Sequence, residues 1–462
     1  MTSGLVRELA AIVGPKAVLD DEAARPYQRD STEMQGLAGQ ADAVVLPSNV
    51  EQVRRLVAWC YEHEVAIVPR GGGTGFAGGA VPVEGGVVLS LERLDRVLRF
   101  DPELWRMQVE AGVRTGRVHR LARENGLLFP PDPGAAEQST IGGNVACNAG
   151  GPHSFKYGVT AHWVTGLEAV VTGGELIRLG GPLRKDVAGL DLRSLLIGSE
   201  GTLGVIVRVW LRLTPAPEAM IPVVAAYPSV EAGVMGLGRV YGYGLLPAAL
   251  EYFDAGAVAA SRAAFPSGLP EATAFLVVAE ADGTRQGAEA LAAEVAEALA
   301  EGALEVRRLG TPGEIRDLWR WRSGVSFAVS AQLGGKMSED IAVPLDRLGE
   351  AIAMVTEIGQ EHGLRTCSWG HAGDANLHAT FMIDASSPEQ VAQATAAASS
   401  LFARTLALGG TVSGEHGLGW VKREQFDRQF GAVEAALQRS IKALFDPKGL
   451  FNPGKKLPPA TR

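Results

Sequence analysis

Hydrophobic and polar residues follow two different patterns along this chain, and the change falls near residue 216. In the first half, short apolar runs at 43–47 and 66–69 predict strands, and helical patterns separate runs of this kind. The clearest helical pattern covers 49–64, where Asn49 is a typical N-cap residue and Val53 and Val57 share one face. Many Gly and Pro corners separate these segments, and together they predict an α+β architecture.

The second half begins after a linker-like segment around Pro215 and Pro217. Apolar runs within 221–229, 274–283 and 336–344 predict strands, and Ala-rich segments such as 285–301 and 345–362 predict helices. This spacing predicts an antiparallel sheet with helices on one of its faces.

A glycine-rich loop, PRGGGTGFAGGAVP, covers residues 69–82. Gly73, Gly75 and Gly78 have the G-x-G-x-x-G spacing of a dinucleotide-binding fold, and Asp95 lies at the distance of the ribose-binding acid. That fold requires a helix directly after the loop, whereas here proline, glycine and a β-branched run follow. The loop therefore indicates either a pyrophosphate cradle made of backbone N–H groups or a tight turn between strands.

Composition narrows the class of protein. The 462 residues are 46% hydrophobic and 21% charged with a net charge of −9, which argues against a nucleic-acid-binding surface. Cys60, Cys147 and Cys367 are far apart, which excludes a disulfide framework and any iron–sulfur cluster ligated by these cysteines alone. The first residues do not resemble a signal peptide, and no apolar run approaches the roughly 20 residues of a membrane span. We expect a cytoplasmic protein, and peripheral association with the inner face of the membrane through a partner is the alternative.

Eight motifs occur in an order that resembles one flavoprotein family. PRGGGTGFAGG, PPDPG, STIGGNVACNAGG, KYGVT and GSEGTLGVI are similar to the flavin-binding half of the vanillyl-alcohol-oxidase/p-cresol-methylhydroxylase (PCMH) family. GHAGDANLH, GTVSGEHGLG and DPKGLFNPGK are similar to the C-terminal half of the branch that contains D-lactate dehydrogenases, D-2-hydroxyglutarate dehydrogenases and the glycolate oxidase flavin subunit. The resemblance covers about Ala43 to Lys455.

The resemblance implies an α+β fold in which a two-subdomain, PCMH-type FAD-binding domain precedes an α+β cap with an antiparallel sheet and helices. We expect an N-terminal helical lead at 1–36, the FAD-binding domain at 37–216, the substrate domain at 217–455 and a tail at 456–462. Because the glycine loop contains no His, we expect FAD to be bound non-covalently, with Cys147 and His153 as the nearest candidates for attachment.

The resemblance also implies which residues contact FAD, and they fall in the glycine clusters and at the C-terminal asparagine. They are Pro69, Arg70, Gly71, Gly72, Gly73, Thr74, Gly75, Gly78, Pro131, Asp132, Ser139, Thr140, Gly142, Gly143, Asn144, Asn148, Gly150, Gly151, Tyr157, Gly158, Val159, Thr160, Glu200, Gly201, Gly204, Val205, Ile206 and Asn452. Asn144 and Asn148 are four residues apart, which predicts a shared helix face, and exposed polar side chains are the alternative reading.

His371 and His378 flank a loop-like AGDAN segment that can fold both imidazoles toward one point, and Glu415 lies in SGEHGLG. Two His and one Glu suit Zn²⁺, Mn²⁺ or Fe²⁺ with positions left for substrate. From the residues alone, a chance grouping of these three residues is as good an explanation as a metal site. The resemblance implies the metal site, because the metal-binding residues of the resembled branch fall on these three positions.

The remaining site residues rest on the resemblance too. His416 is the expected catalytic base, and Arg322 the expected clamp on the substrate carboxylate, because a guanidinium binds a carboxylate with two parallel bonds. Ser326 and Lys336 are expected near the substrate, and Asn376 near the substrate or the flavin, with Arg320 as the alternative to Arg322. Ala375 stands where the family often has glycine and Ser326 where some members have threonine, which weakens any inference about the acid bound.

The leading hypothesis is an FAD-dependent oxidation of a 2-hydroxy acid to the 2-oxo acid, with hydride passing to flavin N5. We expect a small 2-hydroxy acid substrate, an electron acceptor such as a quinone, a cytochrome or an iron–sulfur subunit, no nucleic acid, and possible self-association as a homodimer. The alternatives are the flavin subunit of a glycolate oxidase complex, a metal-dependent hydrolase that uses the His/His/Glu trio, and a NAD-dependent dehydrogenase.

Overall fold

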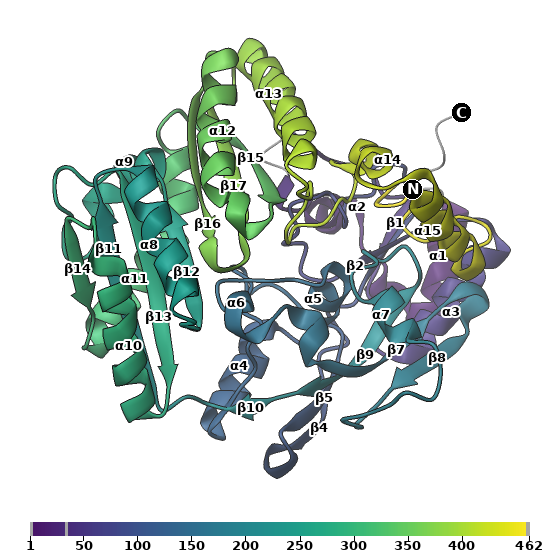
Figure 1. Cartoon of the computed structure of the whole chain (residues 1–462). Helices are drawn as coiled ribbons and strands as arrows, with labels where there is room; N and C mark the ends of the chain where they lie inside the picture. The colour runs from purple at the N-terminus through teal and green to yellow at the C-terminus, as the bar shows by residue number, and fades with distance from the viewer. Residues whose placement is uncertain (1–2, 33–35, 459–462) are drawn as a thin grey trace. The chain divides into compact units, whose positions relative to one another are not determined.

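The computed structural model describes residues 3–32 and 36–458, and it divides the chain into two compact units (Figure 1). Unit 1 comprises Met1–Gly150, Gly158–Ala216 and Glu415–Arg462, and unit 2 comprises Gly151–Tyr157 and Pro217–Gly414. The chain therefore leaves unit 1 for seven residues and returns to it. After Ala216 it forms the rest of unit 2, and from Glu415 onward it belongs to unit 1 again.

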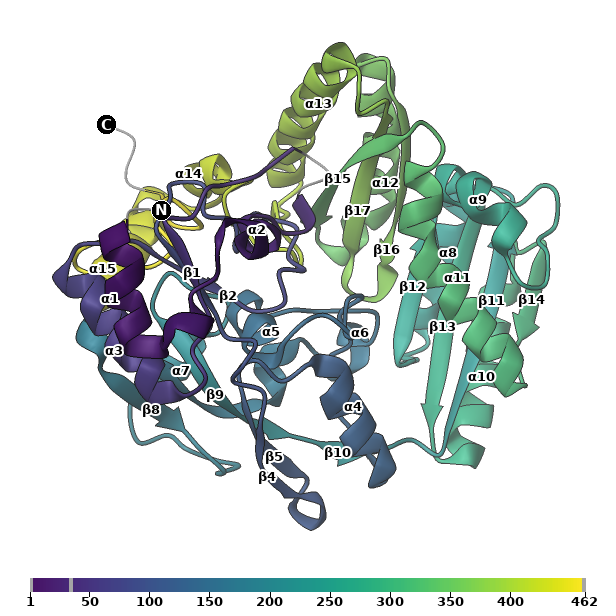
Figure 2. The same cartoon turned by 180° about the vertical axis from the view of Figure 1, so that it is seen from behind.

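Unit 1 contains two larger sheets and a short one, and Figure 2 shows its elements from behind. The helices are α1 (Ser3–Val13), α2 (Asp21–Ala24), α3 (Val50–Glu62), α4 (Thr115–Glu124), α5 (Ile141–Cys147), α7 (Leu192–Leu196), α14 (Phe426–Gln429) and α15 (Ala432–Phe445). The strands are β1 (Ala43–Val45), β2 (Ile67–Arg70), β3 (Val87–Ser90), β4 (Val97–Asp101), β5 (Arg106–Glu110), β6 (Leu127–Leu128), β7 (Val164–Val170), β8 (Leu176–Gly180), β9 (Val205–Arg212) and β10 (Thr214–Pro215).

The first sheet of unit 1 is parallel, with strand order β1-β3-β2, and carries the glycine loop at its end. Helix α3 covers it, and Val53 and Val57 of that helix share a core with Val45 and Ile67. The side chain of Asn49 caps α3 by accepting a bond from the N–H of Gln52 at 2.9 Å, as the sequence predicted. Residues 71–86 form turns and bends up to β3, so the helix that a dinucleotide-binding fold requires is absent from this described segment.

The second larger sheet of unit 1 has the order β4-β5-β9-β7-β8 and is antiparallel throughout, and a two-stranded pair of β6 and β10 accompanies it. Unit 1 thus consists of two α+β parts, as expected for the FAD-binding half.

Unit 2 is built on a seven-stranded antiparallel sheet with the order β14-β11-β13-β12-β16-β17-β15. The strands are β11 (Ala219–Tyr227), β12 (Ala249–Phe253), β13 (Phe275–Gly283), β14 (Glu305–Arg308), β15 (Gly335–Ala342), β16 (Arg365–His371) and β17 (Asn376–Ile383). The helices are α6 (Ser154–Tyr157), α8 (Val230–Gly242), α9 (Ala255–Ser261), α10 (Arg285–Ala300), α11 (Pro312–Ser330), α12 (Leu348–Glu361) and α13 (Pro388–Ala407).

The prediction that helices cover one face of this sheet is wrong. Val224, Leu276 and Val278 pack in one core with residues of α9 and α11. The side chains of Tyr227 and Phe275 point to the other face, where they fill the space that Gly236 and Gly233 of α8 leave open. Strands β11 and β13 are buried along most of their length because both of their faces are covered, so alternation could not reveal a solvent face.

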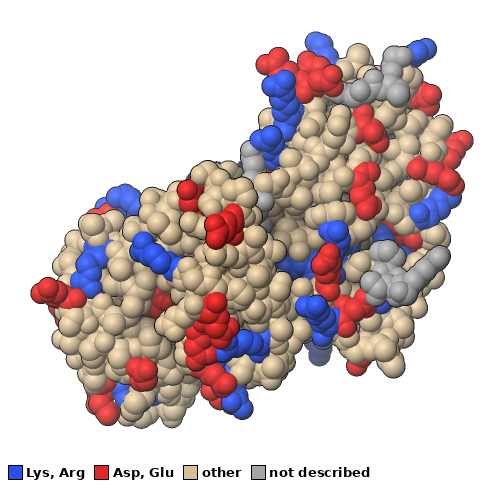
Figure 3. Space-filling model, turned by 90° about the horizontal axis from the view of Figure 1, so that it is seen from above, with Lys and Arg blue, Asp and Glu red and all other residues tan. Residues whose placement is uncertain are grey.

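The charged side chains of the surface are mixed. Basic and acidic residues are interspersed on the face shown in Figure 3. Within the described residues, no helix combines the length and the apolar character needed to cross a membrane.

Candidate functional site

The glycine loop of unit 1 lies directly against a second glycine cluster. A Cβ atom on Gly71 would run into the hydroxyl of Thr140, and one on Gly72 would overlap the backbone carbonyl of Gln138. Gly75, in contrast, has open space where its Cβ would lie. Glycine is therefore required by close packing at the first two positions, whereas the third borders open space.

The second cluster begins helix α5, whose N-cap residue Thr140 accepts a bond from the N–H of Gly143 at 3.3 Å. Asn144 is buried and donates to the hydroxyl of Thr115 at 2.8 Å, and that hydroxyl also bonds Ser139 at 2.7 Å. The alternative reading of Asn144 as a surface polar residue is wrong.

Asn148 does not share the helix face that the sequence predicted for it. It follows α5 as the C-cap in a left-handed conformation, with φ of 53°, and its side chain accepts a bond from the N–H of Ala161 at 2.9 Å. The helix ends one residue before Asn148, which turns its side chain toward the following loop.

The C-terminal segment braces the glycine loop from within unit 1. Asn452 donates to the carbonyl oxygens of Gly79 at 2.9 Å and Glu200 at 2.7 Å. The ammonium group of Lys455 also donates to Gly79, at 3.0 Å, and burial lowers the pKa of this lysine to about 7. The side-chain amide nitrogen of Asn452 thus holds two loops together. The sequence predicted Asn452 only as an FAD contact and did not predict this structural role.

Two other predicted cofactor residues also have structural partners. Arg70 donates to the carbonyl oxygens of Arg29 at 2.6 Å and Pro26 at 3.1 Å, so its guanidinium group holds the N-terminal segment. Tyr157 belongs to unit 2, where its hydroxyl donates to the carboxylate of Asp282.

His371 and His378 lie on one face of the sheet of unit 2. His371 ends β16 and pairs with Asn376 at the start of β17, so His378, two residues further along β17, points to the same side. Their rings are 5.6 Å apart between centroids and nearly perpendicular, at 83°. The tight turn between the strands places Ala375 at a φ of 51°, a left-handed conformation that accounts for the glycine often found at this position in the resembled family.

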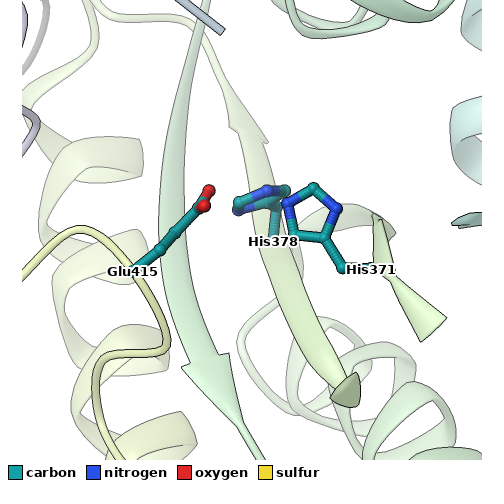
Figure 4. Close-up of side chains that lie close together, drawn as sticks. All are labelled: His371, His378 and Glu415. Atoms are coloured by element: carbon teal, nitrogen blue, oxygen red, sulfur yellow. The ribbon is translucent and has the colours of Figure 1, made fainter. Parts of the chain in front are cut away.

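Glu415 completes the predicted trio. It directly follows Gly414, the last residue of unit 2, and Ser413 is fixed to Asp340 by a hydrogen bond of 2.9 Å. One potential ligand atom from each of His371, His378 and Glu415 lies within 4.8 Å of the others (Figure 4). The next residue, His416, lies 3.6 Å from the Glu415 carboxylate and stacks obliquely on Phe76.

Arg322 projects from α11 toward the same face of the sheet and reaches Glu251 of β12. Its Nε and Nη2 atoms both donate to Oε2 of Glu251, at 2.7 and 2.5 Å. The other carboxylate oxygen of Glu251 pairs with Nδ1 of His371. Burial raises the pKa of Glu251, but the charges of Arg322 and His371 outweigh it and lower the pKa to about 2.

Lys336 and Ser326 also meet on this face. The Lys336 ammonium group donates to the backbone carbonyl of Ser326 at 2.9 Å and to its hydroxyl, and it lies over the ring of Trp369. Burial lowers the pKa of Lys336 to about 8, so the side chain remains protonated at neutral pH.

The two remaining predictions fare differently. Asn376 is buried and donates to Asp340 and to the carbonyl oxygen of Ile341, at 2.7 and 2.8 Å. Arg320, the alternative clamp, has a side chain 78% exposed and pairs with Asp317 on the helix surface. The structure thus brings Arg322, and not Arg320, to the two histidines.

Two family models match the chain. The FAD binding domain covers residues 41–180, and the C-terminal domain of FAD linked oxidases covers residues 216–456. The chain belongs to the FAD-linked oxidases.

Curated relatives of this FAD-linked oxidase are similar over almost its whole length. It is 34% identical to glycolate oxidase subunit GlcD of Bacillus subtilis, over 98% of this chain and 97% of that protein. The D-lactate dehydrogenase of Anaerostipes hadrus is 31% identical, over 98% of this chain and 97% of its own length. The D-2-hydroxyglutarate dehydrogenase of Xanthomonas citri pv. viticola is 36% identical, over 89% of this chain and 88% of its own length.

A solved structure of p-cresol methylhydroxylase has the same fold, with a TM-score of 0.81, 20% identity, and coverage of 99% of this chain and 98% of that chain. The family and fold expected from the motifs are confirmed. The NAD-dependent alternative is excluded, because the matched domain binds FAD and no helix follows the loop in residues 71–86.

The residues of unit 1 fit the FAD that this family binds. The hydroxyl of Ser199 and one carboxylate oxygen of Asp30 are buried, and within the described residues they have no hydrogen-bond partner. Buried polar atoms of this kind are normally satisfied, so both atoms could bond polar groups of a bound molecule. The open space beside Gly75 would let backbone N–H groups of the loop reach a pyrophosphate.

Sequence reasoning missed Glu251 and Thr115. Glu251 interrupts the apolar run AALEYF, and a lone charge inside a buried strand is a signal of a paired, functional group. Thr115 carries no such signal, since a threonine at a helix start is expected as an ordinary cap.

Proposed function

We propose that this FAD-linked oxidase oxidises a 2-hydroxy acid of the glycolate, D-lactate or D-2-hydroxyglutarate type to the 2-oxo acid. The observation that carries the proposal is the convergence of His371, His378 and Glu415, whose potential ligand atoms lie within 4.8 Å. The names of the relatives support the substrate class: a glycolate oxidase subunit, a D-lactate dehydrogenase and a D-2-hydroxyglutarate dehydrogenase.

The trio would hold one divalent cation, Zn²⁺, Mn²⁺ or Fe²⁺, because two imidazoles and a carboxylate suit these metals and leave positions for a substrate. A cation there would polarise the 2-hydroxyl group of a bound acid. His416, adjacent to Glu415, would accept the hydroxyl proton as the general base. Bound FAD supplies the hydride acceptor.

The substrate carboxylate would be bound by cations of unit 2. Arg322 and Lys336 both project to the face that carries the two histidines, and a guanidinium group suits a carboxylate in particular. Ser326, which Lys336 contacts, and Asn376 would adjoin the substrate.

FAD would be bound non-covalently. Burial raises the pKa of the Cys147 thiol to about 12, which disfavours the thiolate that covalent attachment needs. His153 is engaged with Glu280 at 2.8 Å. Acid precipitation should therefore release the flavin into the supernatant, and a yellow pellet would contradict this.

The test of the function combines three measurements on the purified protein: its visible absorption spectrum, its metal content, and its activity on a panel of 2-hydroxy acids with an artificial electron acceptor. We expect two flavin bands, about one divalent cation per chain, and flavin reduction by at least one 2-hydroxy acid. A metal-stripped protein that reduces its flavin at the full rate would refute the metal role. A metal-dependent hydrolase, the alternative of another class, would not reduce flavin with any of these acids.

A second candidate is the flavin subunit of a glycolate oxidase complex, favoured by the GlcD relatives. Cys60, Cys147 and Cys367 are free cysteines from distant parts of the chain, so the electrons would leave through an iron–sulfur partner rather than through this chain. Turnover with an artificial acceptor but not with a soluble quinone would favour this candidate.

A further inference from the structure

Glu251 lies near the predicted metal site and is completely buried, with 0% of its surface exposed. It lies on β12, directly across from His371 of β16 in the sheet register. Because a carboxylate without partners is very costly to bury, its two oxygens must be compensated by neighbouring groups.

The compensation is divided between two partners. Oxygen Oε2 accepts both bonds from Arg322, and oxygen Oε1 pairs with Nδ1 of His371. An ionised carboxylate only accepts hydrogen bonds, so the proton of this pair lies on Nδ1 of His371. In a neutral imidazole, the lone pair then lies on the other ring nitrogen, Nε2.

Nε2 is the ring nitrogen that faces the other members of the trio. In Figure 4, one ring nitrogen of His371 points toward His378 and Glu415, and the other points away from them. The bond to Glu251 therefore leaves a lone pair on the side where a cation would be held.

We propose that Glu251 is a positioning residue of the metal site: it fixes the orientation and tautomer of His371, and Arg322 fixes Glu251 in turn. This inference rests on the proposed metal site and adds a residue to it that acts only through His371. Carboxylates that orient a metal-bound histidine in this way typically contribute 10- to 100-fold to metal affinity.

Unit 2 offers a matched control. Glu280 of β13 is also buried, and it pairs with His153 at 2.8 Å and with the indole N–H of Trp319 at 2.8 Å. This is the same carboxylate–histidine chemistry, but His153 is not one of the three residues whose ligand atoms converge.

The test titrates Co²⁺ into the metal-stripped, flavin-loaded protein and follows the visible bands of the bound cobalt. We expect Glu251→Gln to weaken Co²⁺ binding about 10- to 100-fold and Glu280→Gln to leave it unchanged. Equal Co²⁺ affinity in wild type and Glu251→Gln would overturn the inference. Wild-type protein that binds no Co²⁺, Zn²⁺ or Mn²⁺ at all would instead refute the proposed metal site itself.

A second measurement is made on the wild-type protein, and a variant serves only to assign the signals. ¹⁵N-histidine NMR of the metal-free wild-type protein, with His371→Ala to assign the signals, reports which ring nitrogen carries the proton. We expect the proton of His371 on Nδ1, and a proton on Nε2 would overturn the inference.

Discussion

The candidate sites in the two units of this FAD-linked oxidase are built differently, from backbone atoms in unit 1 and from side chains in unit 2. In unit 1, the glycine loop and the start of α5 approach so closely that Gly71 and Gly72 have no room for a Cβ atom. In unit 2, the polar side chains Glu251, His371 and His378 project from strands of one sheet. A site made of backbone depends on the absence of side chains, whereas a site made of side chains depends on the register of the strands.

This difference predicts that the two functions can be damaged separately. Side-chain variants of the trio and its neighbours should change metal binding and catalysis while the flavin stays bound. Glycine variants of the loop should change flavin binding first. A variant that removes flavin and metal together would contradict this separation.

The largest effect is expected for His378→Ala. It removes one of three metal ligands, so metal and activity should be lost together, with a rate lower by on the order of 10³-fold, because a bound cation supplies several kcal/mol of stabilisation. The flavin absorbance should persist. Metal analysis, absorption and steady-state rates on the same sample check this, and His362→Ala, a histidine outside the trio, is the control.

His416→Ala should keep both the metal and the flavin yet lower kcat by roughly 10²–10⁴-fold, the usual range for loss of a general base. The comparison with His378→Ala separates a base from a ligand. If His416→Ala loses its metal, His416 acts as a ligand and the assignment of the base is wrong.

Arg322→Lys should lower kcat/KM by about 1.5–3 kcal/mol, or roughly 10- to 150-fold, because an ammonium group cannot make the paired bonds of a guanidinium group. In the structure Arg322 uses two nitrogens on Glu251, so the variant should also disturb that carboxylate. Arg320→Lys on the exposed side of α11 is the matched control. Equal kcat/KM in both variants would remove Arg322 from the substrate site.

Gly72→Ala and Gly189→Ala test the backbone-built site. A Cβ at Gly72 would overlap the Gln138 carbonyl, whereas one at Gly189, an exposed glycine outside the predicted FAD contacts, meets open space. Gly72→Ala should therefore weaken flavin retention by about 1–3 kcal/mol, the usual cost of overpacking, and Gly189→Ala should leave it unchanged. Flavin dissociation during dialysis measures the difference, and equal losses in the two variants would contradict it.

The smallest effect is expected for Ala375→Gly. Ala375 has a φ of 51°, a conformation that costs an L-residue roughly 1–2 kcal/mol and glycine almost nothing. Glycine also gives the unfolded chain more conformational entropy, which offsets part of this relief of strain. We therefore expect the free energy of unfolding to rise by up to about 1 kcal/mol. Urea unfolding of the flavin-loaded protein checks the sign, and a destabilised variant would contradict it.

Much of unit 1 could be predicted from local patterns. Asn49 marks the start of α3, and the proline and glycines after Gly78 exclude the helix of a dinucleotide-binding fold. Unit 2 was less accessible, because β11 and β13 are apolar on both faces and gave no sign that α8 and α9 cover opposite sides. The two histidines were found because they flank a recognisable turn.

By itself, the sequence determined the glycine-lined loops, the family and the residues of the His/His/Glu trio. Each of these depends on residue types at short spacing or on motifs in order. Only the tertiary structure revealed that Glu251 joins Arg322 to His371 and that Asn452 holds two loops of unit 1 together. These contacts join residues up to several hundred positions apart, and the strand order and register that create them arise only when the sheets assemble.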